Sequence, residues 1–157
     1  MNSKGRKMYK VDLIMYYGRE ILILMSMILY CSIVIRNKDL VPLDEAVSKK
    51  TARKVNIITK IVVGIFFAII FEGNIIPAIQ DIPYILENKY EMVTGYAVST
   101  DFGRDTEHLR QFIVEDENHK RIRVNVYTEN VYVGDYMKIV YLPHTHAGSV
   151  LERSKQE

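Results

Sequence analysis

Apolar residues form two long runs in the first half of the chain and short, alternating patterns in the second half. The first run, Ile21–Ile35, has no charged residue, and the second, Ile61–Phe71, is shorter. The 15 residues of the first run would span only about 22 Å as a helix. A bilayer core of about 30 Å needs roughly 20 helical residues. Each helix must therefore extend beyond its uncharged run.

These lengths predict a two-helix transmembrane anchor over residues 11–80, preceded by an N-terminal tail at 1–10. The first helix should begin near Val11–Leu13, and the second should end near Pro77 and Pro83, because proline interrupts helical hydrogen bonding. A pair of buried helices in a soluble bundle is the alternative, but the rest of the chain has little apolar surface to cover them. The side chains expected at one membrane interface are Tyr16, Tyr17, Arg19 and Glu20.

From Tyr90 onward the apolar residues alternate with polar ones, as in half-buried strands. Within 121–127, Ile122, Val124 and Val126 should face a core, and a hairpin turn at 117–119 should place Glu115 opposite Arg121. The expected strands are 91–99, 111–116, 120–127, 137–141 and 149–152. We therefore predict a membrane-anchored α+β protein, in which two transmembrane helices precede a small all-β barrel, OB-like or SH3-like, at 88–152, with a tail at 153–157.

Charge is distributed unevenly between the two halves of the chain. Residues 1–80 contain 12 Lys/Arg and six Asp/Glu, a net charge of +6, and residues 81–157 have a net charge of −4. An acidic second half lacks the basic surface of a nucleic-acid-binding domain. Because basic loops stay in the cytoplasm, the basic loop at 36–56 predicts a cytoplasmic connection and an extracytoplasmic C-terminal domain. The N-terminal basic residues oppose this orientation: Lys4, Arg6, Lys7 and Lys10.

The loop itself contains a candidate binding surface. Residues 42–55 read as a short helix whose last turn holds Lys49, Lys50, Arg53 and Lys54, matching the helix dipole. At 100° per residue these four cations lie within an arc of about 140°. They predict a patch for anionic lipid headgroups or an acidic protein partner. An ordinary cytoplasmic loop that follows the charge rule is the simpler explanation.

Two charges inside the predicted helices raise the question of their partners. In antiparallel helices, Arg19 and Glu72 would both lie roughly 23 Å from the cytoplasmic end. Because a charge at that depth is costly, we expect them to form an intramembrane pair. In the alternative, Arg19 reaches the headgroups beside Glu20, and Glu72 lies protonated or near the surface.

Four histidines and one cysteine are the remaining candidates for chemistry. His144 and His146, two residues apart on a strand, would share one face and suggest a metal site, with His108 and His119 also available. No cysteine or suitably spaced acid supports that site, so we expect no metal and no cofactor. The single cysteine, Cys31, lies inside an apolar run. A basic edge at Lys120, Arg121 and Arg123 is better explained by cross-strand pairing with acids.

The run 132–143, YVGDYMKIVYLP, fits the pattern VGDxVxVxYxP, and Gly95 lies early in the same domain. It resembles the small β domains of bacterial two-helix membrane proteins and, loosely, the membrane-anchored OB domains of NfeD-like proteins. The resemblance covers roughly residues 90–152. It implies a small barrel on a membrane anchor and carries over no catalytic residues.

Together these features predict a non-enzymatic, membrane-anchored accessory or binding protein in the cell membrane. Its β domain would engage a protein partner in the membrane or at its surface, with anionic headgroups as a further partner and no nucleic acid. The alternative is a metal-dependent or hydrolytic enzyme that uses the end of the barrel carrying His144 and His146.

Overall fold

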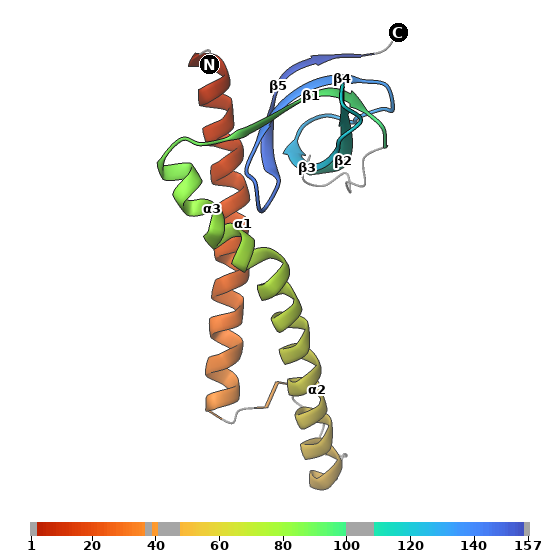
Figure 1. The fold of residues 1–157 in the computed structure, drawn as a ribbon. Coiled ribbons are helices and arrows are strands. Elements are labelled where there is room, and N and C mark those ends of the chain that lie inside the picture. The colour runs from red at the N-terminus through yellow and green to blue at the C-terminus, as the bar shows by residue number, and fades with distance from the viewer. Residues whose placement is uncertain (1–2, 37–38, 41–47, 100–108, 156–157) are drawn as a thin grey trace. The chain divides into compact units, whose positions relative to one another are not determined.

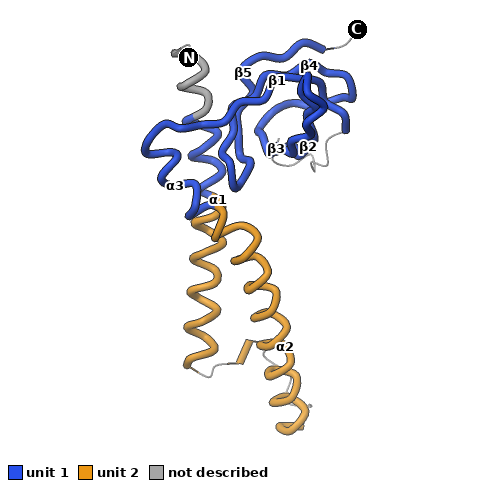
Figure 2. Tube along the Cα trace, in the orientation of Figure 1, with its two compact units in different colours: residues 1–18, 78–157 blue, residues 19–77 orange. Residues whose placement is uncertain are grey.

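The computed structural model describes residues 3–36, 39–40, 48–99 and 109–155. Its elements are α1 (Ser3–Ile35), α2 (Lys49–Ile70), the π-helical turn η1 (Phe71–Ile75), α3 (Ile76–Leu86), β1 (Glu91–Ala97), β2 (Leu109–Asp116), β3 (Arg121–Tyr127), β4 (Tyr136–Tyr141) and β5 (Ala147–Ser154) (Figure 1). They divide into two compact units (Figure 2). Residues 19–77 form the helical unit, and residues 1–18 with 78–157 form the barrel unit.

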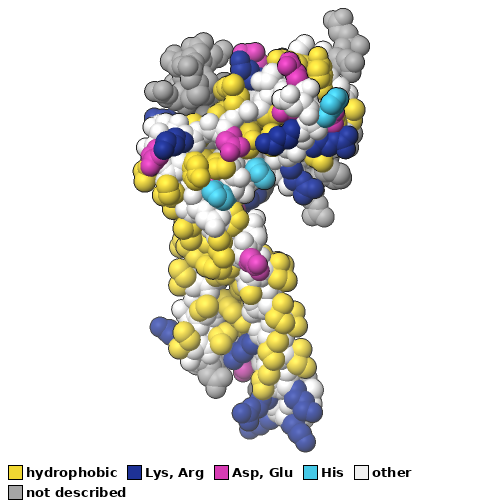
Figure 3. Space-filling model, viewed as in Figure 1, with side chains coloured by type: hydrophobic (Ala, Val, Ile, Leu, Met, Phe, Trp, Pro, Cys, Tyr) yellow, Lys and Arg dark blue, Asp and Glu magenta, His cyan; other side chains and the backbone are white. Residues whose placement is uncertain are grey.

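The helical unit exposes most of its large apolar side chains (Figure 3). Where its helices meet, Tyr30 of α1 donates a hydrogen bond to the Lys60 carbonyl of α2. A Cβ at Gly64 would lie 2.9 Å from the Tyr30 hydroxyl oxygen, so a glycine permits this contact. The helical segments 10–35 and 49–86 are both long and apolar enough to cross a membrane. Two long apolar helices were predicted, and this part of the prediction is confirmed.

The second helical segment runs beyond its predicted end, because Pro77 and Pro83 lie inside helix. In η1 the backbone wraps more widely, and the Ile76 amide donates to the Phe71 carbonyl five residues back. This wider turn comes directly before Pro77, where a regular α-helix would have to accommodate the proline ring and its missing donor. The predicted stop at the prolines is therefore wrong.

The helix ends instead in a Schellman motif after Leu86. Asn88 has a left-handed φ of 53°. The Lys89 amide donates to the Tyr84 carbonyl at 2.8 Å, and the Asn88 amide donates to the Ile85 carbonyl at 3.2 Å. These two bonds satisfy carbonyls at the end of α3 and turn the chain directly into β1.

The five strands form a closed barrel in the order β1-β2-β3-β5-β4. All neighbours are antiparallel except β3 and β5, which are parallel and joined by only two residue pairs. Glu115 pairs with Arg121 across β2 and β3, as the sequence predicts. Gly95 makes a close approach possible between β1 and β2, since a Cβ there would lie 1.9 Å from the Glu115 carbonyl oxygen.

The barrel interior is apolar and follows the predicted alternation. Val124 and Val126 are fully buried, Ile122 packs against them, and Arg121 and Arg123 are exposed. The buried members of this core are Val93, Ala97, Phe112, Val114, Val124, Val126, Val131, Met137, Ile139 and Tyr141. The prediction of a small β domain after two apolar helices is therefore confirmed.

The barrel unit also includes helical residues that the sequence assigned to the tail and anchor. α1 already begins at Ser3, within the predicted tail, and its buried Tyr16 packs against Leu142 and Ala147 in a second apolar cluster. The Tyr17 hydroxyl donates to the Ala78 carbonyl of α3 at 2.9 Å. Both tyrosines therefore contact the barrel unit, whereas we predicted them at a membrane interface. The hydrophobic pattern is the same for either environment, and packing against the barrel does not test the depth of these residues in a membrane.

Candidate functional site

The turn between β4 and β5, Leu142–His146, is attached to α3 by one buried carboxylate. Asp81 of α3 is fully buried. Its Oδ1 accepts a hydrogen bond from the His144 amide at 3.1 Å and lies 2.9 Å from His144 Nδ1. Its Oδ2 accepts from the Thr145 amide at 2.8 Å and from the Thr145 hydroxyl at 2.6 Å. Four contacts thus satisfy both oxygens within the chain.

The same turn is fixed on its other side by β3. Asn125 Nδ2 donates to the Thr145 carbonyl at 3.0 Å, and Gln111 Nε2 donates to Asn125 Oδ1 at 2.9 Å. The His144 ring stands edge-on to Tyr84 of α3, with ring centroids 5.5 Å apart. A chain of polar contacts therefore joins α3, the β4–β5 turn and the β2–β3 face.

This geometry changes the reading of the two histidines. They do not share a strand face, because His144 and His146 lie in the turn and His146 has a left-handed φ of 53°. Across the described residues no group of three His, Cys, Asp or Glu side chains gathers as metal ligands do. His119 lies in the β2–β3 turn beside Glu115, and His108 falls outside the described residues. Asp81 orients His144, but it also binds a hydroxyl and two amides, so it shapes the turn.

Sequence analysis missed Asp81, although a signal was present. It is the only charged residue between Glu72 and Glu87, in a segment that is otherwise apolar or neutral. A lone acid in such a segment requires donors when it is buried. Those donors come from a turn that follows 63 residues later, and no local pattern predicts that pairing.

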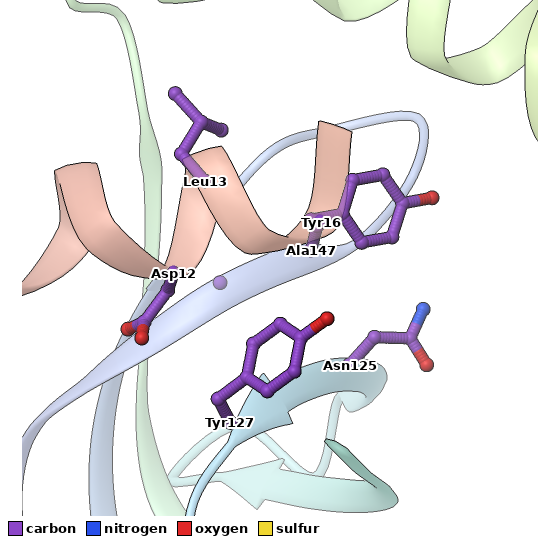
Figure 4. Close-up of a pocket in the computed structure, with 7 residues that line it drawn as sticks. Asp12, Leu13, Tyr16, Asn125, Tyr127 and Ala147 are labelled. Carbon is purple, nitrogen blue, oxygen red and sulfur yellow. The ribbon is translucent and has the colours of Figure 1, made fainter. Parts of the chain in front are cut away.

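Among the described residues of the barrel unit, two hollows differ in size and in how open they are. The first lies between α1 and strands β3 and β5, with the Asp12, Tyr16, Asn125 and Tyr127 side chains around it (Figure 4). Its volume of about 10 Å³ admits at most one water molecule. The second is an open depression of about 250 Å³ beside Gln111, Ile113 and Arg123 on the β2–β3 face.

The turn before β4 holds apolar side chains in solvent. Tyr132 and Val133 are 59% and 57% exposed. Gly134, with φ of 94°, allows the turn to close through a hydrogen bond from the Asp135 amide to the Tyr132 carbonyl. The turn is then tied to β1, because Gly134 donates to the Ala97 carbonyl and Ala97 donates to the Asp135 carbonyl. Turns usually carry polar residues at such positions.

A buried ion pair fixes this turn further. Asp135 is 2% exposed and accepts from the Tyr132 amide at 3.1 Å and from Arg153 Nη2 at 2.6 Å. Arg153 also donates to the Asn130 carbonyl. Next to the turn, Tyr96 is 58% exposed and stands edge-on to Tyr136. We call this set the turn patch: the exposed Tyr96, Val98, Tyr132 and Val133, with the half-buried Tyr136 beside Tyr96.

The predicted basic patch lies at the start of α2, which corrects the predicted loop helix. Ser48 caps this helix by accepting from the Thr51 amide at 3.3 Å, and residues 41–47 fall outside the description. The four cations therefore stand at the positive end of a helix dipole, and the predicted match to a helix C-terminus is wrong. All four are exposed (Figure 3): Lys49, Lys50, Arg53 and Lys54.

The structure does not bring the predicted pair of Arg19 and Glu72 into an ion pair among the described residues. Arg19 Nη2 lies 2.6 Å from Glu20 Oε1, as in the alternative arrangement. Glu20 is buried, whereas Glu72 is exposed. The Arg19–Glu20 ion pair is therefore formed by adjacent residues of α1 and does not involve α2. Sequence analysis had left both arrangements of Arg19 open.

Two pairs of charges on the barrel surface join neighbouring strands, Glu115 with Arg121 and Lys138 with Glu152. Glu115 lies 2.7 Å from Arg121 and 3.0 Å from His119, and hydrogen bonds from His119 and Arg121 lower the pKa of its carboxyl. Burial, with a hydrogen bond to Glu91, raises the pKa of the Tyr141 hydroxyl. The predicted pairing of the basic edge at Arg121 is confirmed.

Comparisons with family models, curated proteins and solved structures found no match for the chain.

Proposed function

We propose that the protein is a membrane-anchored binding protein whose barrel unit engages a protein partner through the turn patch. The two long apolar helical segments support membrane insertion, since their exposed aliphatic surface suits hydrocarbon. The basic residues that flank their connection support a cytoplasmic loop and an extracytoplasmic barrel.

The barrel is best described as OB-like. A five-stranded barrel with the order 1-2-3-5-4 and a parallel β3–β5 closure favours this class over an SH3-like one. OB folds bind many of their ligands on the β2–β3 face. Here the outward side chains of that face bind one another, as in the Gln111–Asn125 and Glu115–Arg121 pairs. Residues of α1 also pack beside Tyr127, so the usual ligand face is partly occupied.

The turn patch is the observation that carries the proposal. One aromatic side chain, Tyr132, and one aliphatic side chain, Val133, are each more than half exposed at this turn and leave apolar surface in water. The turn is held by backbone bonds to β1 and by the Asp135–Arg153 ion pair, so binding would order few additional groups. Rigid, exposed tyrosines are typical anchors of protein interfaces. A preorganised apolar surface of this kind fits a protein partner.

Site-specific photo-crosslinking in cells that express the full chain tests the proposal. A photoreactive amino acid at Tyr132 should give one discrete protein adduct, and the same group at Asn118, in the polar β2–β3 turn, should not. Replacing Val133 with Asp should abolish the adduct without changing the amount of protein in the membrane. Equal adduct patterns at positions 132 and 118 would contradict the proposal, and an adduct at twice the chain's mass would identify a second copy as the partner.

A further inference from the structure

The start of α2 concentrates positive charge that no acidic side chain among the described residues neutralises. Lys49, Lys50, Arg53 and Lys54 are exposed, and the first turn of the helix contains no acidic residue. No ion pair to any of the four forms in the part of the chain that the structure describes. The cluster therefore differs from Arg121 and Lys138 of the barrel, each of which pairs with a glutamate on a neighbouring strand.

This arrangement opposes helix formation in isolation. Lys49 and Arg53 are four residues apart, as are Lys50 and Lys54, so like charges adjoin on the helix surface. The positive end of the helix dipole adds to the repulsion. The Ser48 cap stabilises the first turn but carries no charge. An external anion would remove this repulsion.

The cations also stand at a defined distance from an apolar surface. Val55, Ile57 and Ile58 follow them directly and are exposed. Between them, buried Asn56 accepts a hydrogen bond from the Leu40 amide at 2.9 Å, so the connecting segment returns to the helix at this level. A polar residue that binds loop backbone marks the boundary between water and hydrocarbon more readily than the hydrocarbon interior.

Distances along the helix then locate the cations. Lys54, Arg53 and Lys50 precede Asn56 by two, three and six residues. At 1.5 Å per residue these steps amount to about 3, 4.5 and 9 Å. The polar headgroup region adds roughly 5–8 Å to each side of a bilayer core. With Asn56 at the edge of the hydrocarbon, these distances would place the cations at the depth of lipid phosphates.

We propose that these four cations bind the phosphates of anionic phospholipids in the leaflet at this end of the helical unit. The inference rests on the membrane insertion proposed above and adds a lipid class to it. An acidic protein partner would need positive charge but not this depth, directly beside exposed aliphatic residues. Charge and position together therefore favour lipid.

Native mass spectrometry of the full chain, released from bilayers of phosphatidylcholine and phosphatidylglycerol, tests the proposal. The wild type should retain phosphatidylglycerol preferentially. Lys50→Gln with Arg53→Gln should reduce that preference by more than about tenfold, because each cation near an anionic surface contributes about 1 kcal/mol, or about fivefold. Lys50→Arg with Arg53→Lys should retain it, since charge is preserved. The matched control, Lys120→Gln with Arg123→Gln, removes two exposed barrel cations and should leave the preference unchanged.

The outcomes separate this inference from the proposed function. An unchanged preference in Lys50→Gln with Arg53→Gln overturns it, even if the protein remains integral to the membrane. Release of the wild type from membranes by alkaline carbonate would instead contradict membrane insertion. Displacement of the lipid by millimolar glycerol phosphate would assign the site to a soluble phosphate. A photoreactive group at position 49 should yield lipid adducts, and protein adducts alone would overturn the inference in favour of an acidic partner.

Discussion

Two turns of the barrel are each held by a buried aspartate, yet they present opposite surfaces. Asp81 reaches the β4–β5 turn from α3 and satisfies the turn's own donors. Asp135 lies inside the turn before β4 and pairs with Arg153 of β5. The first turn directs its polar groups inward, toward a helix. The second leaves Tyr132 and Val133 in solvent.

The β4–β5 turn is an internal joint between α3 and the barrel, whereas the turn before β4 presents a surface that is available to other molecules. The contacts of Asp81 are all explained by the need to attach α3 to the barrel. The contacts of Asp135 explain why its turn is rigid, but they do not explain why apolar residues occupy it. A turn that only connected two strands would be as stable, and more soluble, with polar side chains at 132 and 133. The binding function proposed above would account for the apolar residues.

Removing the Asp81 carboxylate should have the largest effect. Asp81→Ala leaves the His144 and Thr145 amides and the Thr145 hydroxyl without their acceptor. Each buried donor that loses its partner costs about 1–3 kcal/mol, so the free energy of unfolding should fall by about 4 kcal/mol. Chemical denaturation of the detergent-solubilised chain measures the loss. Hydrogen exchange should accelerate in both α3 and the β4–β5 turn.

Glu87→Ala is the matched control, because Glu87 is exposed and pairs only with Lys89 at the surface. It should change the free energy of unfolding by less than about 1 kcal/mol. If Asp81→Ala were equally mild, the carboxylate would not be the joint between α3 and the barrel.

Asp135→Ala should destabilise less and only locally. It breaks a largely buried ion pair and leaves the Tyr132 amide unpaired, which should reduce the free energy of unfolding by about 3 kcal/mol. Hydrogen exchange should accelerate around residues 132–135 while α3 keeps its protection. Faster exchange in α3 would show that the two turns are coupled, and the contrast between them would fail.

The two aspartates also mark what the sequence can reveal. Asp135 follows Gly134 and precedes an alternating strand, so neighbouring residues alone indicate a turn at this position. The same local logic predicted the β2–β3 hairpin and its register. Asp81 depends on contacts 63 and 64 residues away, which no period or propensity encodes.

Hydrophobic periodicity has a related limit at the helices. It indicates that residues 11–18 and 78–86 have an apolar face, but it does not say whether lipid or a barrel covers that face. Tyr16 and Ala78 pack within the barrel unit, although the sequence placed both inside the predicted anchor at 11–80. The exposure of the turn patch could not be predicted from the sequence either, because a tyrosine in or beside a strand can pack inward or point outward.

Removing the charge of Glu115 beside the β2–β3 turn should have the smallest effect on stability, because the charges around it are largely exposed. Hydrogen bonds from His119 and Arg121 lower the pKa of Glu115 below the ordinary value of a glutamate. The stabilisation is therefore complete above the ordinary pKa of about 4.3 and is lost as the pH falls through the folded-state pKa. Glu115→Gln should lower the Tm slightly at pH 7, and the difference from wild type should shrink as the pH falls through the folded-state pKa of Glu115. A difference that did not depend on pH would contradict the ionic origin.

The central claim is that an extracytoplasmic barrel uses the turn patch to bind a partner. Single cysteines at positions 118 and 132, each in a Cys31→Ser background, can be compared for their rate of reaction with a membrane-impermeant maleimide. In intact cells, position 118 should react rapidly and position 132 slowly, because the partner covers it. After purification, both should react at similar rates, since both positions are exposed in the chain alone. Equal rates in cells would contradict an occupied patch, and reaction only after permeabilisation would contradict the orientation.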